Sequence, residues 1–165
     1  MAKAKKPNAP APNGDRVLAT NRRARFDYEL GDKYEAGISL IGSEARSLRD
    51  TAPGLNEAWV ELDKRGEVWV RQMRIAPMVH AAFSHDEVRP RKLLLHRTEI
   101  DRIRAAVDRE GMTLIPTQIY FKKGRAKLEF AVAEGKKKHD KRAAIKAREA
   151  DFEAKAAMQR GRKDY

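Results

Sequence analysis

Large apolar side chains are confined to one stretch of this chain, so only that stretch can form a hydrophobic core. Nearly all of the Val, Ile, Leu, Phe and Trp residues lie between residues 17 and 134. A stretch of about 120 residues suits a single domain, because domains cluster near 100–150 residues. Residues 1–16 consist mainly of Ala, Lys, Pro and Asn and offer little to bury, so we predict a disordered basic N-terminal extension there.

The chain carries a net charge of +12, and half of it lies in the last fifth of the sequence. Residues 17–134 contain 21 basic and 18 acidic residues, whereas residues 135–165 contain 11 basic and 5 acidic residues. A charge of this size indicates an anionic partner: nucleic acid, an anionic membrane or an acidic protein. No stretch approaches the roughly 18–20 apolar residues that span a bilayer, so we expect a cytoplasmic protein with no membrane partner.

Alternation of apolar and polar residues predicts two β-hairpins in the middle of the chain. Residues 58–62 and 68–71 alternate with period 2, and the loop 64–66 between them ends in a glycine suited to positive φ. A second pair of alternating runs, at 113–121 and 128–132, is joined by a turn around Lys123-Gly124. The stretch 26–41 is a further predicted strand, broken by its two glycines.

Helices are predicted at two places. Between the hairpins, apolar residues at 100, 103 and 107 form a stripe, with Thr98 as N-cap, Asp101 three residues on and Gly111 at the end. A shorter helix is predicted over Ser43–Arg49, with its alanine and leucine facing inward. Five or six strands and two helices in about 120 residues favour a mainly β fold, a small OB-like β-barrel with peripheral helices.

Catalytic and metal-binding motifs do not stand out in this sequence. The four histidines form no His-x-x-x-His pair, and no cysteine can join them. Phosphate-binding glycine loops and the Gly-x-Ser-x-Gly motif are absent from the sequence. We therefore predict that the protein is not an enzyme, and that it needs no metal, cofactor or small-molecule substrate.

The surface of the predicted barrel carries tryptophans and basic clusters. In a hairpin with a three-residue loop, Trp59 lies opposite Arg71, and Trp69 lies opposite Glu61. We expect both tryptophans to pack on a second buried face; the alternative is an exposed platform on which bases stack. Basic clusters at 22–25, 89–92 and 122–127 suit phosphate groups, although the second is equally consistent with a solvated loop.

The basic tail has a strong helical bias but little to bury. Arg142–Arg160 contains seven alanines with Lys, Arg and Glu between them. Its large apolar residues are Ile145, Phe152 and Met158, and the last lies off the face shared by the other two. Isolated helices of this length are marginal in water. We therefore predict that residues 135–165 are disordered alone and become helical on an external anionic surface; the alternative is a solubilising tail.

A series of short motifs, in a specific order and spacing, runs from Asn21 to Arg162. The motifs are Asn21–Arg25, Tyr34–Gly37, Ser43–Arg49, Arg91–Leu95, Gly135–Arg142 and Ile145–Glu149. In this order they closely resemble the family of SsrA-binding proteins, SmpB, the bacterial partners of tmRNA.

The resemblance implies an OB-like barrel with peripheral helices and a role in trans-translation, the rescue of ribosomes stalled on messages without a stop codon. In that family the barrel binds the tRNA-like domain of tmRNA. The tail then enters the empty mRNA channel of the ribosome and becomes helical against small-subunit ribosomal RNA near the decoding centre. The same division is expected here, with an RNA-binding barrel at 17–134 and a ribosome-entering tail at 135–165.

Site residues follow from the resemblance together with the basic clusters. Glu35, Leu94 and Lys127 match positions implicated in binding the tRNA-like domain, and His96 stands where relatives can carry Asn. The full predicted tmRNA-binding set is Asn21, Arg22, Arg23, Arg25, Glu35, Arg91, Lys92, Leu94, His96 and Lys127. The predicted ribosome-binding set in the tail is Lys136, Lys137, Lys138, His139, Asp140, Lys141, Arg142, Lys146 and Arg148.

The sequence is also compatible with two other classes of function. Small basic barrels with disordered tails also occur among structural ribosomal proteins. An RNA-processing enzyme is a third reading, because the many carboxylates do not formally exclude one.

Overall fold

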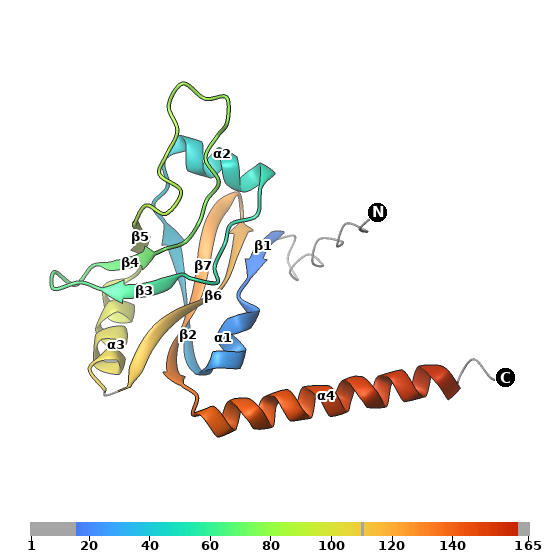
Figure 1. Ribbon diagram of the computed structural model, residues 1–165. Coiled ribbons are helices and arrows are strands. Elements are labelled where there is room, and N and C mark those ends of the chain that lie inside the picture. The colour runs from blue at the N-terminus through green and yellow to red at the C-terminus, as the bar shows by residue number, and fades with distance from the viewer. Residues whose placement is uncertain (1–15, 110, 162–165) are drawn as a thin grey trace.

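Seven antiparallel strands form one sheet that closes on itself, with helices outside it (Figure 1). The computed structural model describes residues 16–109 and 111–161. In chain order the elements are β1 (Arg16–Thr20), α1 (Arg22–Asp27), β2 (Tyr28–Ile38), α2 (Gly42–Asp50), β3 (Trp59–Leu62), β4 (Val68–Arg71), β5 (Arg91–Leu94), α3 (Arg97–Val107), β6 (Met112–Lys122), β7 (Arg125–Gly135) and α4 (Lys138–Gly161).

The strands form an uneven ring. Six of them follow the order β6-β3-β4-β5-β2-β7, and pairing of β7 with β6 closes the circle. The long strands β2, β6 and β7 share extended ladders, whereas the described β3–β6 register is the single pair Val60↔Leu114. β1 adds to the far end of β6. The mainly β fold with peripheral helices is confirmed as barrel-like.

Both predicted hairpins are confirmed, and so is the register predicted for the first of them. Trp59 pairs with Arg71, and Glu61 pairs with Trp69. Gly66 has a φ of +81°, which a residue without Cβ adopts readily. At the second turn, Lys123 and Gly124 have φ values of +51° and +76°. Inward-facing residues of these strands, together with Leu48 of α2 and Ile103 of α3, form one main core cluster.

Several element predictions need correction. Up to Gly135, the described residues contain seven strands and three helices, where five or six strands and two helices were predicted for the barrel. Residues 22–27 form helix α1, capped by Asn21, and β2 runs through both glycines with a register shift between Leu30 and Lys33. Glycine can be accommodated in a strand whose neighbours supply the ladder, so the glycines did not end β2.

The boundaries of α3 also differ from the prediction. His96 occupies the N-cap position instead of Thr98, and its backbone N–H donates to the Glu99 carboxylate at 2.9 Å. The helix ends at Val107, and Gly111 lies beyond it with a φ of +79°, directly before β6. In α2, Leu48 is buried as predicted, whereas Ala45 is only partly buried.

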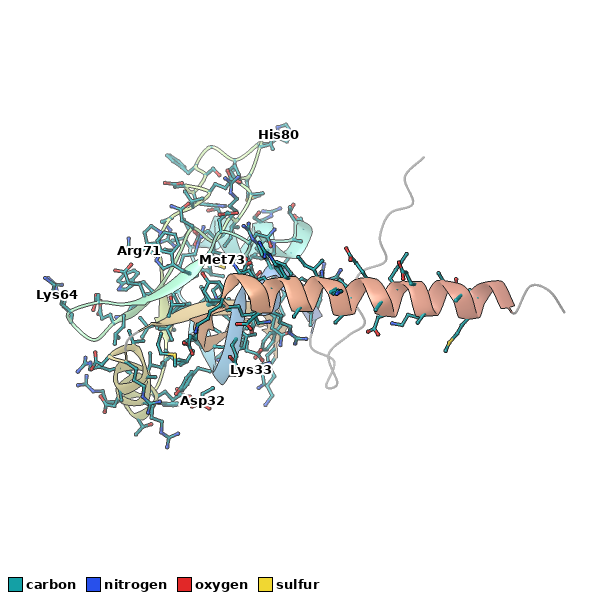
Figure 2. All side chains as sticks on the ribbon, turned by 60° about the horizontal axis from the view of Figure 1, so that its bottom comes forward. Asp32, Lys33, Lys64, Arg71, Met73 and His80 are labelled. Carbon is teal, nitrogen blue, oxygen red and sulfur yellow. The ribbon has the colours of Figure 1, made fainter. Side chains whose placement is uncertain are left out.

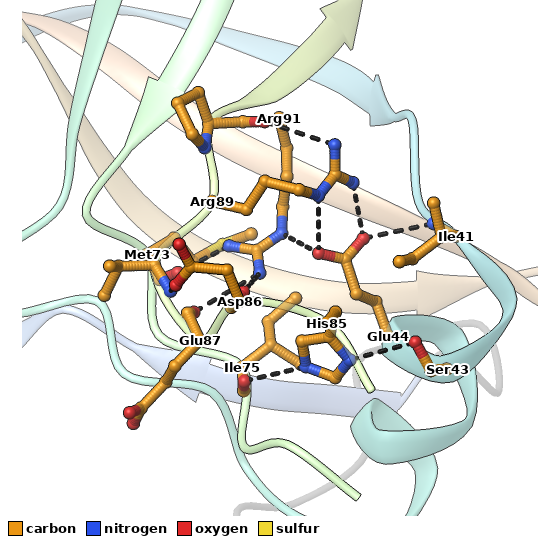
Figure 3. Close-up of polar contacts among 12 residues, drawn as sticks. Ile41, Ser43, Glu44, Met73, Ile75, His85, Asp86, Glu87, Arg89 and Arg91 are labelled. Carbon is orange, nitrogen blue, oxygen red and sulfur yellow. Dashed lines mark hydrogen bonds and ion pairs between the residues drawn. The ribbon is translucent and has the colours of Figure 1, made fainter. Parts of the chain in front are cut away.

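A buried ionic network holds α2 against the segment that leads into β5 (Figure 3). The Glu44 carboxylate is fully buried and accepts hydrogen bonds from the Arg91 side chain at 2.7 Å, from Arg89 at 2.7 and 3.1 Å, and from the Ile41 backbone at 3.1 Å. Burial alone would raise the pKa of Glu44, but these donors hold it below its ordinary value. The network thereby fixes the start of β5, which leads to the candidate site.

Helix α4 projects away from the barrel (Figures 1 and 2). Contacts near its start join it to α1: Lys141 Nζ lies 3.4 Å from Asp27 Oδ1, and the Arg148 guanidinium lies 5.6 Å from the centre of the Phe26 ring. Just before the helix, the Lys136 backbone donates to the Asp27 carbonyl at 3.0 Å. None of the helices in the described residues is sufficiently long and apolar to cross a membrane.

Candidate nucleic-acid interface

Four residues that are far apart in the sequence line one depression of about 580 Å³ on the barrel surface. Glu35 comes from β2, Leu94 from β5, His96 from the junction of β5 and α3, and Lys127 from β7. These are the positions that the family resemblance singled out. The structure therefore brings this part of the predicted tmRNA-binding set together.

Strand β2 builds this depression because it pairs with both of its neighbours at the same point. Gly37 is the register partner of Leu94 on β5 and of Lys127 on β7. A Cβ atom at position 37 would lie 3.4 Å from Leu94 Cβ and 3.8 Å from Lys127 Nζ. The absence of a side chain at Gly37 therefore keeps the space between the side chains of Leu94 and Lys127 open.

Glu35 is one of two acidic residues that line the depression, with Glu99, and cations and a phenol keep Glu35 ionised. The Tyr120 hydroxyl donates to its carboxylate, and Lys122 Nζ lies 3.3 Å from both carboxylate oxygens. The hydrogen bond from Tyr120 is the main cause that lowers the pKa of Glu35, and Lys122 and Lys127 lower it further against the effect of burial. A fixed carboxylate can accept hydrogen bonds from RNA 2′-hydroxyl or base amino groups.

Leu94 supplies an exposed apolar surface beside these charges. Its side chain is 56% exposed, which is unusual for a leucine at the end of a barrel strand whose neighbour Leu93 is buried. Strand alternation explains the pair, since successive side chains point to opposite faces. Apolar contact with a ribose or base, charge contact with phosphate and a carboxylate acceptor are thus available within one depression.

Tyr120, Lys122 and Arg125 belong to this site, and the predicted set did not include them. Arg125 lines the depression, while Tyr120 and Lys122 hold Glu35. The sequence did point to Lys122 and Arg125, since both fall in the basic cluster at 122–127. It did not point to Tyr120, because the partner of Tyr120 is 85 residues away in the sequence and only the β2–β7–β6 pairing brings them together.

Two predicted RNA contacts are corrected by burial. Arg91 has no exposed surface; besides Glu44 it donates to the Met73 carbonyl and to the backbone of the preceding loop. Asn21 is 4% exposed, and its amide caps α1 and donates to two backbone carbonyls. The polar groups of each side chain form hydrogen bonds inside the protein. Arg91 and Asn21 therefore hold neighbouring segments in place and do not face RNA.

The remaining predicted cations of the barrel lie away from the depression. Lys92 points outward from β5 like Leu94, and its Nζ lies 2.7 Å from the Glu67 carboxylate. Arg22, Arg23 and Arg25 are exposed on α1, on a different part of the barrel. Arg89 lies in the basic segment before β5, and its side chain forms an ion pair with the buried Glu44. The segment is therefore neither a free binding loop nor a merely solvated one.

The tail cations are only partly engaged with the barrel. Lys136, Lys141 and Arg148 contact α1, as described above. Lys137, Asp140, Arg142 and Lys146 are exposed. The side chains of Lys138 and His139 lie outside the described part of the structure, so their predicted roles stay predictions.

The two tryptophans differ in exposure, and the prediction that both pack on a second buried face is wrong for Trp59. Trp69 is half-buried, and its indole N–H donates to Asp63 at 3.2 Å. Trp59 is 42% exposed and lines a separate cavity beside α1. As for metals, no group of three or more His, Asp or Glu residues that could hold an ion occurs within 16–109 and 111–161.

Comparison with known proteins decides the family. A sequence model described as "SmpB protein" matches residues 18–160, which is most of the chain. The chain belongs to the SmpB family.

Curated relatives that align with this chain over almost their whole length are named SsrA-binding proteins. The chain is 46% identical to the SsrA-binding protein of Sorangium cellulosum, covering 96% of this chain and 98% of the relative. It is 45% identical to that of Anaeromyxobacter dehalogenans, with 93% and 94% covered, and 41% identical to that of Bifidobacterium longum, with 90% and 95% covered.

A solved SmpB structure has a similar fold. It is described as "tmRNA-SmpB: a journey to the center of the bacterial ribosome" and has 39% sequence identity to this chain. The two superpose with a TM-score of 0.63 over 78% of this chain and 94% of the other. The similarity in both sequence and structure supports the same fold over the matched part of this chain.

Proposed function

We propose that this protein binds the tRNA-like domain of tmRNA and delivers it to stalled ribosomes for trans-translation. The barrel holds tmRNA, and the basic tail probes the empty mRNA channel of the small subunit. The protein works in the cytoplasm by binding alone, with no catalytic step, cofactor or small-molecule substrate. Family membership and the solved tmRNA–SmpB relative support the RNA partner and the ribosome.

The observation that carries the proposal is the depression around Glu35, Leu94, His96 and Lys127. It offers an apolar surface, a fixed carboxylate and cations within one small area, which suits a folded RNA better than a uniform duplex. Folded RNA is recognised through shape, 2′-hydroxyls and unstacked bases, for which such mixed chemistry is needed. Lys127 and Arg125 at the rim supply the contact to phosphate.

Helix α4 supports the assignment of the tail to a second RNA. Its 24 residues extend about 36 Å at 1.5 Å per residue. It presents cations around much of its surface, and its large apolar residues remain exposed. Such a helix is suited to a surrounding anionic surface, and ribosomal RNA lining a channel is one. That the helix forms only on this surface stays a prediction.

Capture of RNA from lysate on the full-length protein, followed by sequencing, tests the proposal. One dominant structured RNA of tmRNA type is expected in the bound fraction. Stoichiometric presence of the protein in purified, non-stalled ribosomes would instead favour a structural ribosomal protein. RNA cleavage that depends on a metal and is lost on one Asp or Glu substitution would support the enzyme reading.

A matched pair of charge reversals tests the site itself. Lys127→Glu places a negative charge in the depression, whereas Lys64→Glu makes the same change at the exposed β3–β4 loop. We expect Lys127→Glu to reduce affinity for the isolated tRNA-like domain at least tenfold, while Lys64→Glu has little effect. Equal effects of the two variants would show that net charge, and not this depression, governs binding.

A further inference from the structure

A second cavity, of about 230 Å³, lies between α1 and β3, and none of its lining residues belongs to the depression around Glu35. Its apolar part includes Ala24 of α1, Ile115 of β6 and the exposed ring of Trp59. Ala24 and Ile115 are buried in a small apolar cluster separate from the main core, against which Tyr28 packs. The cavity thus has a firm apolar floor and one exposed aromatic wall.

Comparison of the two tryptophans shows that the exposure of Trp59 is specific to this cavity. Both residues point outward from neighbouring strands of one hairpin. Trp69 is half-buried, with its indole N–H bonded to Asp63, whereas Trp59 is 42% exposed at the mouth of the cavity. Exposed aromatic rings beside basic surface are the usual stacking platforms for unpaired bases.

The rim of the cavity carries groups that match the edge of a base. Arg23 spans it, with Nε 3.1 Å from the Asp27 carboxylate and NH1 3.3 Å from the Glu57 carboxylate. The Arg23–Glu57 pair is largely exposed, so it costs little to rearrange. Asp27 is 23% exposed and keeps one face toward the cavity while it pairs with Arg23 and Lys141. The carboxylates can accept hydrogen bonds from base amino groups, and the guanidinium can then bind phosphate or a base acceptor.

We propose that this cavity binds one unpaired nucleobase of an RNA partner, stacked on Trp59 and read at its edge by Asp27 and Glu57. Because both reading groups are acceptors, bases with an exocyclic amino group, namely adenine, cytosine and guanine, bind better than uracil. Arg22 and Arg25 on the exposed surface of α1 attract the adjoining phosphates. Asp27 also pairs with Lys141 of α4, so the nucleotide lies where barrel and tail meet.

The two tryptophans allow a direct test in the full-length protein. The Trp69→Phe variant leaves Trp59 as its only tryptophan, and Trp59→Phe leaves only Trp69. On titration with eight-nucleotide oligo(A), oligo(C) and oligo(U), we expect saturable quenching of Trp59 emission, stronger for A and C than for U. Trp69 emission should stay constant. Constant Trp59 emission, or equal quenching of both tryptophans, would overturn the proposal.

Affinity measurements provide an independent readout. Trp59→Ala should weaken oligo(A) binding about 5- to 150-fold, the usual effect of losing one stacked base, and Trp59→Tyr should restore most of it. Unchanged affinity in Trp59→Ala would contradict the proposal.

The inference rests on the proposed function only for the identity of the RNA that supplies the base. Loss of affinity for the tRNA-like domain in Trp59→Ala would place the base in tmRNA, and unchanged affinity would place it in another RNA. Failure of Lys127→Glu to affect the tRNA-like domain would count against the proposed function alone.

Discussion

The barrel and helix α4 are stabilised in opposite ways. In the barrel, residues such as Phe130, Leu48 and Ile103 are completely or almost completely buried, and the described buried side-chain polar atoms all have hydrogen-bond partners. In α4, Phe152 and Met158 are each 75% exposed. A structure held by its own core needs no partner, whereas a helix with exposed apolar and basic residues needs a surface to cover them. The chain thus places its own hydrophobic core and the proposed ribosome-binding surface in different regions.

The joint between the two regions is small and polar. Asp27 of α1 pairs with both Arg23 and Lys141, and Phe26 lies under Arg148. Partly exposed ion pairs of this kind contribute little to stability, so they can set the direction in which α4 leaves the barrel without holding the whole helix. The comparison predicts that changes in one region leave the other nearly intact.

Removal of residues 135–165 should have the largest effect. We expect complete loss of rescue of stalled ribosomes, with affinity for the tRNA-like domain and the unfolding transition of the barrel largely unchanged, because the depression around Glu35 contains no tail residue. Rescue is measured by tagging of nascent chains in a reconstituted translation system. Loss of RNA affinity in the truncated protein would contradict this division of labour.

Salt should weaken binding of the tRNA-like domain by a comparable factor with and without the tail. If about six phosphates are neutralised, affinity falls roughly a thousandfold between 50 and 200 mM salt. Filter binding across this range, with the full chain and with the truncated chain, measures both slopes. A flat profile would refute the electrostatic account, and a shallower slope after truncation would show that tail cations also contact the tRNA-like domain.

Glu44→Ala should destabilise the barrel by about 3–5 kcal/mol, because it leaves the buried Arg91 without its carboxylate. Chemical denaturation monitored by tryptophan fluorescence measures the change. Glu57→Ala is the matched control, since its ion pair with Arg23 is exposed and should contribute at most about 1 kcal/mol. Equal destabilisation by the two substitutions would show that the buried network is not special.

The same carboxylate predicts a pH dependence of barrel stability. Because its hydrogen bonds lower the pKa of Glu44, its contribution is present above the ordinary pKa of glutamate. As pH falls through the lowered pKa, the folded state must take up a proton and the contribution is lost. The free energy of unfolding should therefore fall more steeply with acid in the unaltered protein than in Glu44→Gln. Parallel pH profiles would be evidence that Glu44 does not titrate this way.

Loosening the joint should have the smallest effect. Asp27→Ala or Phe26→Ala should increase amide hydrogen exchange in the first turns of α4 by no more than roughly fivefold, equivalent to about 1 kcal/mol. Phe152→Ala, farther along the helix and exposed, should change exchange at these turns very little. A large loss of protection in the barrel would mean that the joint supports the core.

Residue patterns predicted much of the fold because the signals were local. Period-2 alternation located both hairpins, and loop length set the pairing of Trp59 with Arg71. Helix α1 was missed because the basic residues at 22–25 give no apolar stripe over only six residues. The cap of α3 was misplaced because Thr98 and His96 both precede acids three residues on, and only packing selects between them.

Sequence reasoning about the site identified outward-facing residues that the fold brings together, and their contacts with RNA stay predictions. Glu35, Leu94, His96 and Lys127 were identified from family motifs, and the structure places them in one depression. Sequence reasoning failed where a polar side chain is buried and hydrogen-bonded inside the protein, as with Arg91 and Asn21. Arginine in a basic run looks the same in sequence whether it faces RNA or a buried carboxylate.

The sequence by itself determined the division of this protein into a core-forming barrel and a basic, helix-prone tail, because apolar content and charge are properties of the chain alone. Tertiary structure decided which cations are free and which groups share a site. Those outcomes depend on the pairing of β2 with both β5 and β7, and on the packing of α2 against β5, which buries Glu44 with Arg91. Contacts between residues so far apart in the chain arise only when these elements come together in the folded protein.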